Sequence, residues 1–228
     1  MYCRSRKASL LFKSVLILFA IIGLGLQFRV NEGRFEFQMF NFFTVLSNAF
    51  NLVYFMMDFL WLYNAAPPED TTLSPLAKGM STLGVALTMV IANTLLIQMY
   101  TMQTSTAQLV GVVIVHIIVP AMSVLDWLIF DKKGQIRAWH PLFWIILPYM
   151  YLGYAMIAAH IGQGISNFTG SRYPYPFLDV EKLGVPRVAL SVVIITVIFI
   201  GLGYLAYFID QWMARKAGTL AEKPADYV

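Results

Sequence analysis

Thr44 and His116 are residues of this chain whose types could do acyl-transfer chemistry within strongly apolar surroundings. A threonine hydroxyl becomes an effective nucleophile when a neighbouring base accepts its proton, and neutral imidazole is such a base near neutral pH. His116 lies in the middle of the apolar stretch 111–130. An ionisable side chain at that depth in a membrane is costly, so it indicates a function. Together the two residues predict a nucleophile and its general base.

Several polar side chains accompany Thr44 in an otherwise apolar stretch. At 100° per residue they fall within an arc of about 120°, so they would share one helix face. The set is Asn41, Thr44, Ser47, Asn48 and Asn51. Donors on this face could stabilise the oxyanion of a tetrahedral intermediate, and we expect Asn48 to be the main donor, with the other members in support. The alternative is that these side chains only join helices, at ~0.6–2 kcal/mol per hydrogen bond.

The composition indicates the elements that must position these residues. Of 228 residues, 59% are hydrophobic and 12% are charged, whereas a soluble domain carries roughly 25% charged residues. Six apolar stretches reach the ~20 residues needed to cross a bilayer. They are 9–28, 37–63, 80–102, 107–130, 141–164 and 187–213. We therefore predict an all-α, polytopic integral membrane protein, with residues 1–228 forming a single domain of six transmembrane helices.

The positions of the basic residues orient these helices. With the N-terminus in the cytoplasm, eleven of the 16 Lys and Arg residues fall on the inner side, as the positive-inside rule requires. We therefore expect both termini to be cytoplasmic. The net charge of +4 follows from this orientation and gives no reason to expect a nucleic-acid partner.

The same orientation places the two candidate residues at similar depths. Counted at 1.5 Å per residue from the outer ends of 37–63 and 107–130, Thr44 and His116 would lie roughly 10 Å and 14 Å below the outer boundary. They would therefore share a layer in the outer leaflet, within hydrogen-bond reach. His160, near the outer end of the fifth span, is the reserve candidate for the base.

No cofactor is expected. The lone Cys3 excludes an intrachain disulfide and a cysteine-based metal site. No second deep histidine pairs with carboxylates at ligand spacing. The predicted reaction therefore uses protein side chains alone, without metal or organic cofactor.

An outer segment, 164–186, is rich in proline and aromatic residues. Its motif Tyr-Pro-Tyr-Pro-Phe-Leu-Asp spans 173–179, and the prolines favour a rigid, extended backbone. We expect this segment to cover a substrate pocket as a lid. The side chains assigned to the lid or pocket are Tyr173, Tyr175, Phe177 and Asp179. The alternative is an interfacial aromatic belt that anchors the fold.

Two other classes of function stay open. His116, Asp126 and Asp58 could form a proton or ion path through a carrier or channel, or the polar stripe could serve a non-catalytic membrane assembly protein. Pairing with inner-side cations is the simpler explanation for the aspartates. The expected pairs join Asp58, Asp126 and Asp210 to Lys132, Lys133 or Arg215. A closed outer-leaflet pocket would favour hydrolysis, whereas a continuous polar column would favour transport.

Three segments resemble a known family. They are Phe-Phe-Thr-Val-Leu-Ser-Asn at 42–48, His-Ile-Ile-Val-Pro at 116–120 with Asp126-Trp127, and the 173–179 motif. They are similar to bacterial multi-pass membrane proteins grouped with the androgen-induced and androgen-dependent threonine hydrolases of animals, and the 173–179 motif resembles the bacterial branch alone. The resemblance spans nearly the whole chain. It implies a bacterial inner-membrane hydrolase of fatty acid esters of hydroxy fatty acids, or similar lipid esters entering from the membrane. It also implies that Thr44 is the nucleophile and His116 its partner.

Overall fold

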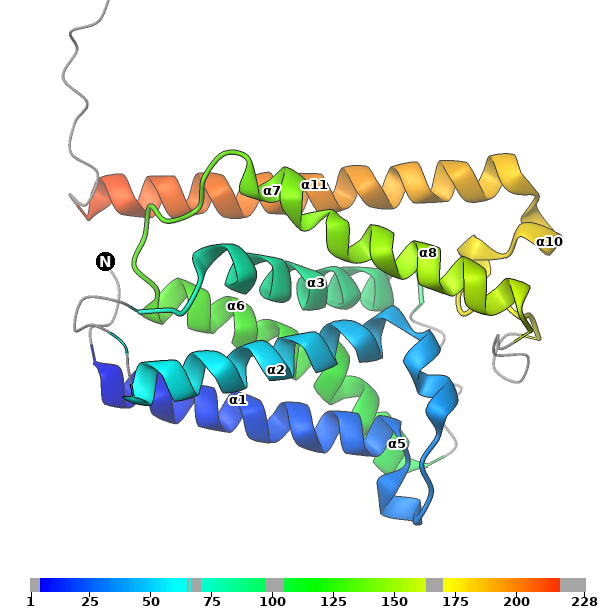
Figure 1. The fold of residues 1–228 in the computed structure, drawn as a ribbon, viewed down its shortest axis with the longest axis horizontal. Helices are drawn as coiled ribbons and strands as arrows, with labels where there is room; N and C mark the ends of the chain where they lie inside the picture. Colours follow the sequence, from blue (N-terminus) through cyan, green and yellow to red (C-terminus); the bar gives the residue numbers. More distant parts are fainter. Residues whose placement is uncertain (1–4, 65, 67–70, 97–104, 163–169, 218–228) are drawn as a thin grey trace, which may run out of the picture.

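A computed structural model describes residues 5–64, 66, 71–96, 105–162 and 170–217. It is all-helical, and six of its helices are long and apolar enough to cross a membrane. The six spans are α1 (Arg6–Gln27), α2 (Phe43–Asn64), α3 (Pro75–Thr94), the rod α5–η3–α6 (Thr106–Phe130), the broken helix α7–α8 (His140–His160) and α11 (Val185–Lys216). The predicted all-α, multi-pass membrane architecture is therefore confirmed (Figure 1).

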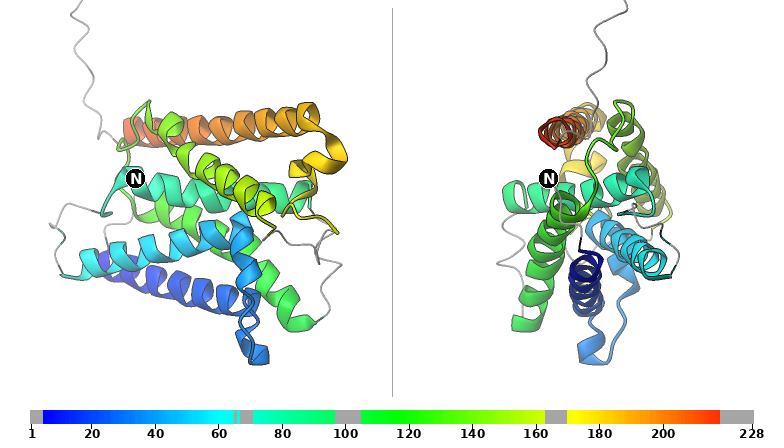
Figure 2. Two further views of the ribbon diagram at one scale, coloured as in Figure 1. Left: turned by 45° about the vertical axis from the view of Figure 1, so that its right-hand side comes forward. Right: turned by 90° about the vertical axis from the view of Figure 1, so that its left-hand side faces the viewer.

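The spans form two groups. Helices α1, α2, α3 and the α5–α6 rod pack against one another, while α11 packs mainly against α7 and the short elements η4 (Pro176–Leu178) and α10 (Val180–Leu183). Figure 2 shows α11 and α7–α8 on one side of the other four spans. Helix α1 begins and α11 ends at the same end of the bundle (Figure 1). We call this end the Arg6 end and the opposite end, where α2 begins, the Thr44 end.

Local sequence explains where several helices begin and break. The Ser74 side chain accepts a hydrogen bond from the Ala77 N–H, and Pro75 occupies the first turn of α3, as is common at helix starts. The fifth span is interrupted at Ile145, between α7 (His140–Trp144) and α8 (Ile146–His160). Pro148 lacks the N–H that would bond the Trp144 carbonyl in a continuous helix, which accounts for the break.

Helix α2 begins later than expected. Residues 37–41 form a separate 3₁₀ turn, η2 (Phe37–Asn41), and Phe42 is extended with φ −93° and ψ 133°. The expectation of a continuous helix over 37–63 is therefore wrong, and so is the placing of Asn41 on the same helix face as Thr44. Thr44 is the second residue of α2 and does not lie two turns inside it.

The remaining boundaries differ by a few residues from those expected. The largest differences concern the third span, predicted at 80–102: the serine cap and Pro75 start α3 five residues earlier, and the helix ends at Thr94, eight residues earlier than expected. The ends of the predicted spans at 97–102 and 163–164 lie outside the described residues. Thr44 is the second residue of α2, whereas His116 is ten residues from the start of the α5–α6 rod. The two residues are therefore not at equal distances from the starts of their helices, as the depth argument assumed.

A buried ionic cluster joins the four packed spans near the Arg6 end. Lys13 Nζ of α1 lies 3.0 Å from Asp58 Oδ2 of α2 and 2.7 Å from Asp126 Oδ2 of α6. Lys78 Nζ of α3 contacts the Asp126 carboxylate directly and lies 2.6 Å from Asp131 Oδ1. All five side chains are buried. Each ion therefore has an opposite charge in contact, which offsets part of the cost of removing it from water.

This cluster corrects the expected pairing of the aspartates. Asp58 and Asp126 pair with Lys13 and Lys78 within the bundle, and not with Lys132, Lys133 or Arg215. Asp210 Oδ2 accepts a hydrogen bond of 3.0 Å from the Ile136 N–H and so holds the segment after α6 against α11. Lys133 Nζ donates to the Trp127 carbonyl and lies over the Trp127 ring.

Removing the central carboxylate should destabilise the bundle. We expect Asp126→Ala to lower the free energy of unfolding by ~3–5 kcal/mol, because it leaves two buried ammonium groups short of a counter-charge. Thermal unfolding of purified protein in micelles, followed by tryptophan fluorescence, measures the effect. Glu181→Ala is the control, since its pair with Arg172 (3.1 Å) is exposed and should contribute nothing measurable. Equal melting temperatures for the two variants would contradict the structural role of the cluster.

Candidate functional site

Thr44 and His116 are in direct contact. The Thr44 Oγ1 atom lies 3.1 Å from His116 Nε2, and His116 Nδ1 lies 2.9 Å from the carbonyl oxygen of Val112. A carbonyl can only accept a hydrogen bond, so Nδ1 carries the ring proton. Nε2 then presents its lone pair, and the Thr44 hydroxyl donates to it. The predicted proximity is confirmed, and the tautomer is the one that a general base requires.

The position of His116 depends on an irregular turn in the α5–α6 rod. Residues Ile114–Ile118 form a π-helical turn, in which the Val119 N–H reaches the Ile114 carbonyl. Pro120 has no N–H to offer the His116 carbonyl, so the regular ladder is interrupted here. Such turns often occur at functional sites because they redirect a side chain. Gly23 of α1 permits the close approach, since a Cβ there would lie 2.6 Å from Ile114 Cγ2.

The start of α2 surrounds Thr44 with hydrogen-bond donors. The first amides of a helix have no intrahelical acceptor, and in α2 the first such bonds come from Val45 and Leu46 to the Phe42 carbonyl. The hydroxyl of Tyr175 lies close to Thr44 and to the first backbone amides of the helix. Burial raises the pKa of the Tyr175 phenol, so this hydroxyl keeps its proton at neutral pH. A protonated phenol therefore lies beside Thr44 at the N-terminus of α2.

Asn48 has a different task from the one expected. Its Nδ2 donates to the Thr44 carbonyl (2.8 Å) and to the Val115 carbonyl (3.1 Å). Both amide hydrogens are thus used in holding α2 against the π-helical turn. Ser47 Oγ also donates to the Thr44 carbonyl, at 3.2 Å. Neither Asn48 amide hydrogen is therefore left to bind an oxyanion at Thr44.

Asn51 and Asn41 likewise connect elements. Asn51 Nδ2 donates to Ser81 Oγ of α3 (2.8 Å), and Asn51 Oδ1 accepts from Ser123 Oγ of α6 (3.1 Å). The Asn41 carbonyl accepts from the Tyr151 hydroxyl (2.8 Å), and Asn41 Oδ1 accepts from Tyr154 (3.1 Å). These contacts position α2 among its neighbours, and neither amide lies against the Thr44 hydroxyl in any of them.

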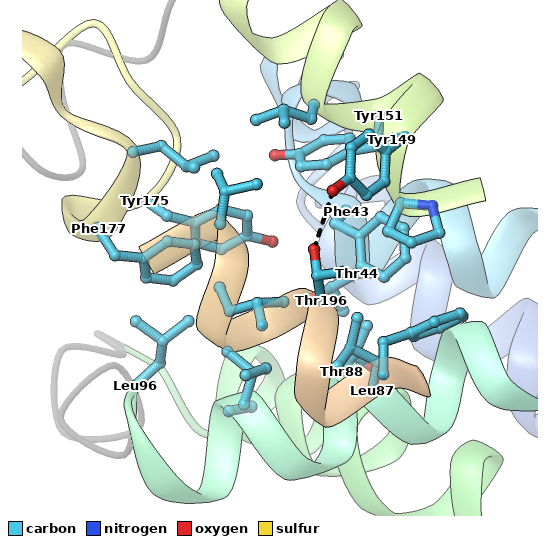
Figure 3. Close-up of a pocket in the computed structure, with 18 of the residues that line it drawn as sticks. Phe43, Thr44, Leu87, Thr88, Leu96, Tyr149, Tyr151, Tyr175, Phe177 and Thr196 are labelled. Atoms are coloured by element: carbon cyan, nitrogen blue, oxygen red, sulfur yellow. Dashed lines mark hydrogen bonds between the residues drawn. The ribbon is translucent and has the colours of Figure 1, made fainter. Parts of the chain in front are cut away.

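Two cavities meet at Thr44. The larger, of about 730 Å³, lies between the start of α2 and helices α3, α8 and α11; we call it the α11 cavity (Figure 3). Its walls include Phe43, Leu87, Ile91, Tyr151, Phe177 and Phe199. The smaller, of about 670 Å³, lies beside the end of α1, and we call it the α1 cavity. Its walls include Gln27, Arg29, Val45, Gln108, Val112 and His116. Thr44 and Tyr175 line both cavities, while His116 lines the α1 cavity.

The outer segment contributes two of its four predicted residues to these walls. Tyr175 and Phe177 line the α11 cavity, with stacked rings whose centroids are 5.1 Å apart. Tyr173 and Asp179 do not line either cavity. Asp179 Oδ1 instead caps α10 by accepting from the Lys182 N–H at 3.0 Å. Burial alone would raise the pKa of the Asp179 carboxyl, but hydrogen bonds from Ser171 and Lys182 outweigh it and lower that pKa.

The other candidates lie apart from the site. His160 is exposed at the C-terminal end of α8 and lines neither cavity. Cys3 and residues 164–169 of the predicted lid lie outside the described residues. Over the part of the chain that the structure describes, no group of three or more His, Cys, Asp or Glu side chains could hold a metal ion.

No protein-family model, curated protein or solved structure matches this chain. Its function must therefore be inferred from the site itself. The sequence did not single out Gln27, Arg29 and Gln108, because no periodic or motif signal links the end of one span to the start of another. Tyr175 was singled out as a lid residue, although its position beside Thr44 had no signal in the sequence.

The tautomer of His116 can be measured. In protein labelled with ¹⁵N-histidine, we expect one of the three histidines to show a protonated Nδ1 and an unprotonated Nε2. Thr44→Val should shift that Nε2 resonance, because it removes the donor. Thr88→Val is the control, since Thr88 Oγ1 donates to the Val85 carbonyl of its own helix. A protonated His116 Nε2 would exclude the base role in this arrangement.

Proposed function

We propose that this protein is a membrane-embedded hydrolase of lipid esters, with Thr44 as the nucleophile and His116 as its general base. The observation that carries the proposal is the 3.1 Å contact between the Thr44 hydroxyl and a His116 nitrogen whose lone pair is exposed because the other ring nitrogen bonds Val112. The resemblance of three segments to membrane threonine hydrolases supports the same assignment.

In the acylation step, Thr44 Oγ1 attacks the ester carbonyl carbon while its proton moves to His116 Nε2. The negative charge on the carbonyl oxygen would be stabilised by the Tyr175 hydroxyl and by the amides at the start of α2, aided by the helix dipole. The bond between the carbonyl carbon and the alcohol oxygen then breaks. The alcohol leaves with the proton from Nε2, and the acyl group stays on Thr44.

In the second step, water attacks the acyl-threonine. His116 Nε2 accepts a proton from the water, and Thr44 Oγ1 recovers that proton when the acyl–oxygen bond breaks. The products are a fatty acid and the regenerated enzyme. Since both steps use the same imidazole as base and then as acid, no metal or organic cofactor is required by this mechanism.

The proposal includes a membrane setting. With both termini cytoplasmic, as the distribution of basic residues favours, the Thr44 end faces the outer leaflet of the bacterial inner membrane. An ester could then enter sideways from that leaflet, with its acyl chain in the α11 cavity. The apolar walls of this cavity suit the acyl chain of such an ester.

A proton path is the second candidate, and one observation favours it. Buried polar side chains continue along α2 from Thr44 through Asn48 and Asn51 to Asp58. Phe55, which is also fully buried, lies between Asn51 and Asp58 in that row, and the Lys13 and Lys78 ammonium groups lie 5.3 and 5.5 Å from its ring centroid. An apolar ring at this level favours a closed site at the Thr44 end over a continuous polar column. A third alternative, a non-catalytic assembly protein, predicts neither activity.

Covalent labelling tests the hydrolase directly. We expect a fluorophosphonate probe to label the purified protein at Thr44, and Thr44→Ala to abolish both labelling and ester hydrolysis. His116→Ala should reduce hydrolysis by ~10²–10⁴-fold, the usual contribution of a positioned base, and the double variant should be hardly worse than either single one. Thr94→Ala, which changes an exposed threonine of α3 that lines neither cavity, should retain both activities.

The proton-path alternative predicts a different pattern of activity in these variants. Proton flux into liposomes that survives Thr44→Ala but disappears in His116→Ala or Asp58→Asn would support transport. Hydrolysis that persists unchanged in Thr44→Ala protein would end the threonine-nucleophile proposal.

A further inference from the structure

The two cavities that meet at Thr44 can be assigned to the two halves of an ester, if the proposed hydrolase mechanism holds. The departing alcohol oxygen must take its proton from His116 Nε2, so the alcohol has to lie on the His116 side. His116 lines the α1 cavity and is not among the residues that line the α11 cavity. The alcohol therefore occupies the α1 cavity, and the acyl chain occupies the α11 cavity.

The α11 cavity presents hydrocarbon to its occupant. Its polar side chains bond to the protein: the Tyr149 hydroxyl pairs with Thr196 Oγ1 at 3.1 Å (Figure 3), Tyr151 donates to the Asn41 carbonyl, and Thr88 donates within its own helix. Their hydrogen-bonding capacity is largely used, and the surrounding walls are apolar. Such a surface suits an alkyl chain and offers no binding site for a charged group.

The α1 cavity differs because amide and guanidinium side chains share its lining with apolar ones. Gln27 ends α1, Gln108 belongs to α5, and Arg29 follows α1 with a left-handed backbone (φ 59°), the one such non-glycine residue among those described. Gln108 Nε2 donates to Glu32 Oε1 at 3.3 Å. An occupant of this cavity would therefore meet two side-chain amides and a guanidinium, and one of the amides is bonded to a carboxylate.

These polar groups are nearly neutral as a set. Arg29 forms ion pairs with Glu36 (3.2 Å) and Glu32 (3.8 Å), and Arg34 pairs with Glu32. Two cations and two anions thus balance. A carboxylate on the alcohol half would gain little from an arginine that is already paired, and it would lie near two glutamates. A long alkyl chain would displace water from these polar groups and would offer no hydrogen bonds in its place.

We infer that the substrate is an ester of one long-chain fatty acid with a small, neutral, polyhydroxy alcohol, of the monoacylglycerol class. Hydroxyl groups both donate and accept hydrogen bonds, which matches a neutral set of amides, a guanidinium and carboxylates. This inference rests on the proposed hydrolase and on the assignment of the α1 cavity to the leaving alcohol. It separates this chain from enzymes whose alcohol half carries a second long chain or a carboxylate.

Three esters of oleic acid test the inference on purified full-length protein in micelles. They are 1-monooleoylglycerol, oleyl oleate and the oleate ester of 12-hydroxystearic acid. We expect kcat/KM for the glycerol ester to exceed that for either of the others by about tenfold or more, which corresponds to one or two hydrogen bonds in free energy. A higher value for oleyl oleate or for the hydroxystearate ester would overturn the inference while leaving the hydrolase in place.

A matched pair of variants tests whether the α1 cavity determines the preference for the glycerol ester. Gln108→Leu should lower kcat/KM for monooleoylglycerol by about tenfold and leave that for oleyl oleate unchanged or raised. Gln38→Leu is the control, since Gln38 is exposed near the same end and lines neither cavity. Equal losses on both esters in Gln108→Leu protein would indicate a folding defect or a general role and would overturn the assignment of the α1 cavity.

A binding measurement separates failure of this inference from failure of the hydrolase. Monooleoylglycerol should bind Thr44→Ala protein, as followed by native mass spectrometry, and Gln108→Leu in that background should weaken binding. Binding with this dependence but without any hydrolysis by the unchanged protein would retain the ligand class and overturn the enzyme. Absence of binding, or binding unaffected by Gln108→Leu, would overturn the ligand class itself.

Discussion

The buried cluster of Lys13, Asp58, Lys78, Asp126 and Asp131 is the constraint on which the rest of the bundle depends. Each of the four packed spans supplies one charged side chain to the cluster, and Asp131 directly follows the fourth span. Apolar side chains slide past one another at small cost, whereas an ammonium and a carboxylate in a dry interior must stay in contact. The cluster therefore fixes how far each helix is rotated about its own axis. That rotation in turn decides which side chains face inward at the opposite end.

The row of polar residues on α2 carries this constraint along the bundle. Asp58 lies in the cluster, Asn51 joins α2 to α3 and α6, and Asn48 joins it to the π-helical turn. Thr44 ends the row, where helix α2 begins. The contact between Thr44 and His116 is thus held by hydrogen bonds one turn below it and by ion pairs further down. Positioning of this kind keeps a hydroxyl and an imidazole within hydrogen-bond distance, as the proposed mechanism requires.

Much of this architecture could be predicted because its signals are local. Hydropathy defines six spans, and helical spacing places Thr44 with Ser47, Asn48 and Asn51 on one face. The start of α2 could not be predicted, since Phe42 is as apolar as its neighbours and only the packing of η2 shows that the helix begins after it. The partners of Asp58 and Asp126 were also missed. Lys13 and Lys78 are far away in sequence, and only the tertiary arrangement of α1, α3 and α6 brings them into the same dry interior.

The long helix α11 has a consequence for the lipid around the protein. It forms one wall of the α11 cavity, yet only 17% of the residues in its most apolar stretch are buried in the bundle. Its 32 residues span about 48 Å at the usual rise, against a hydrocarbon core of roughly 30 Å. A helix that exceeds the bilayer must tilt or project from it. The opposite wall of the α11 cavity is formed by α2 and α3, which ion pairs hold in place. A change in hydrocarbon thickness that altered the tilt of α11 would therefore change the width of this cavity.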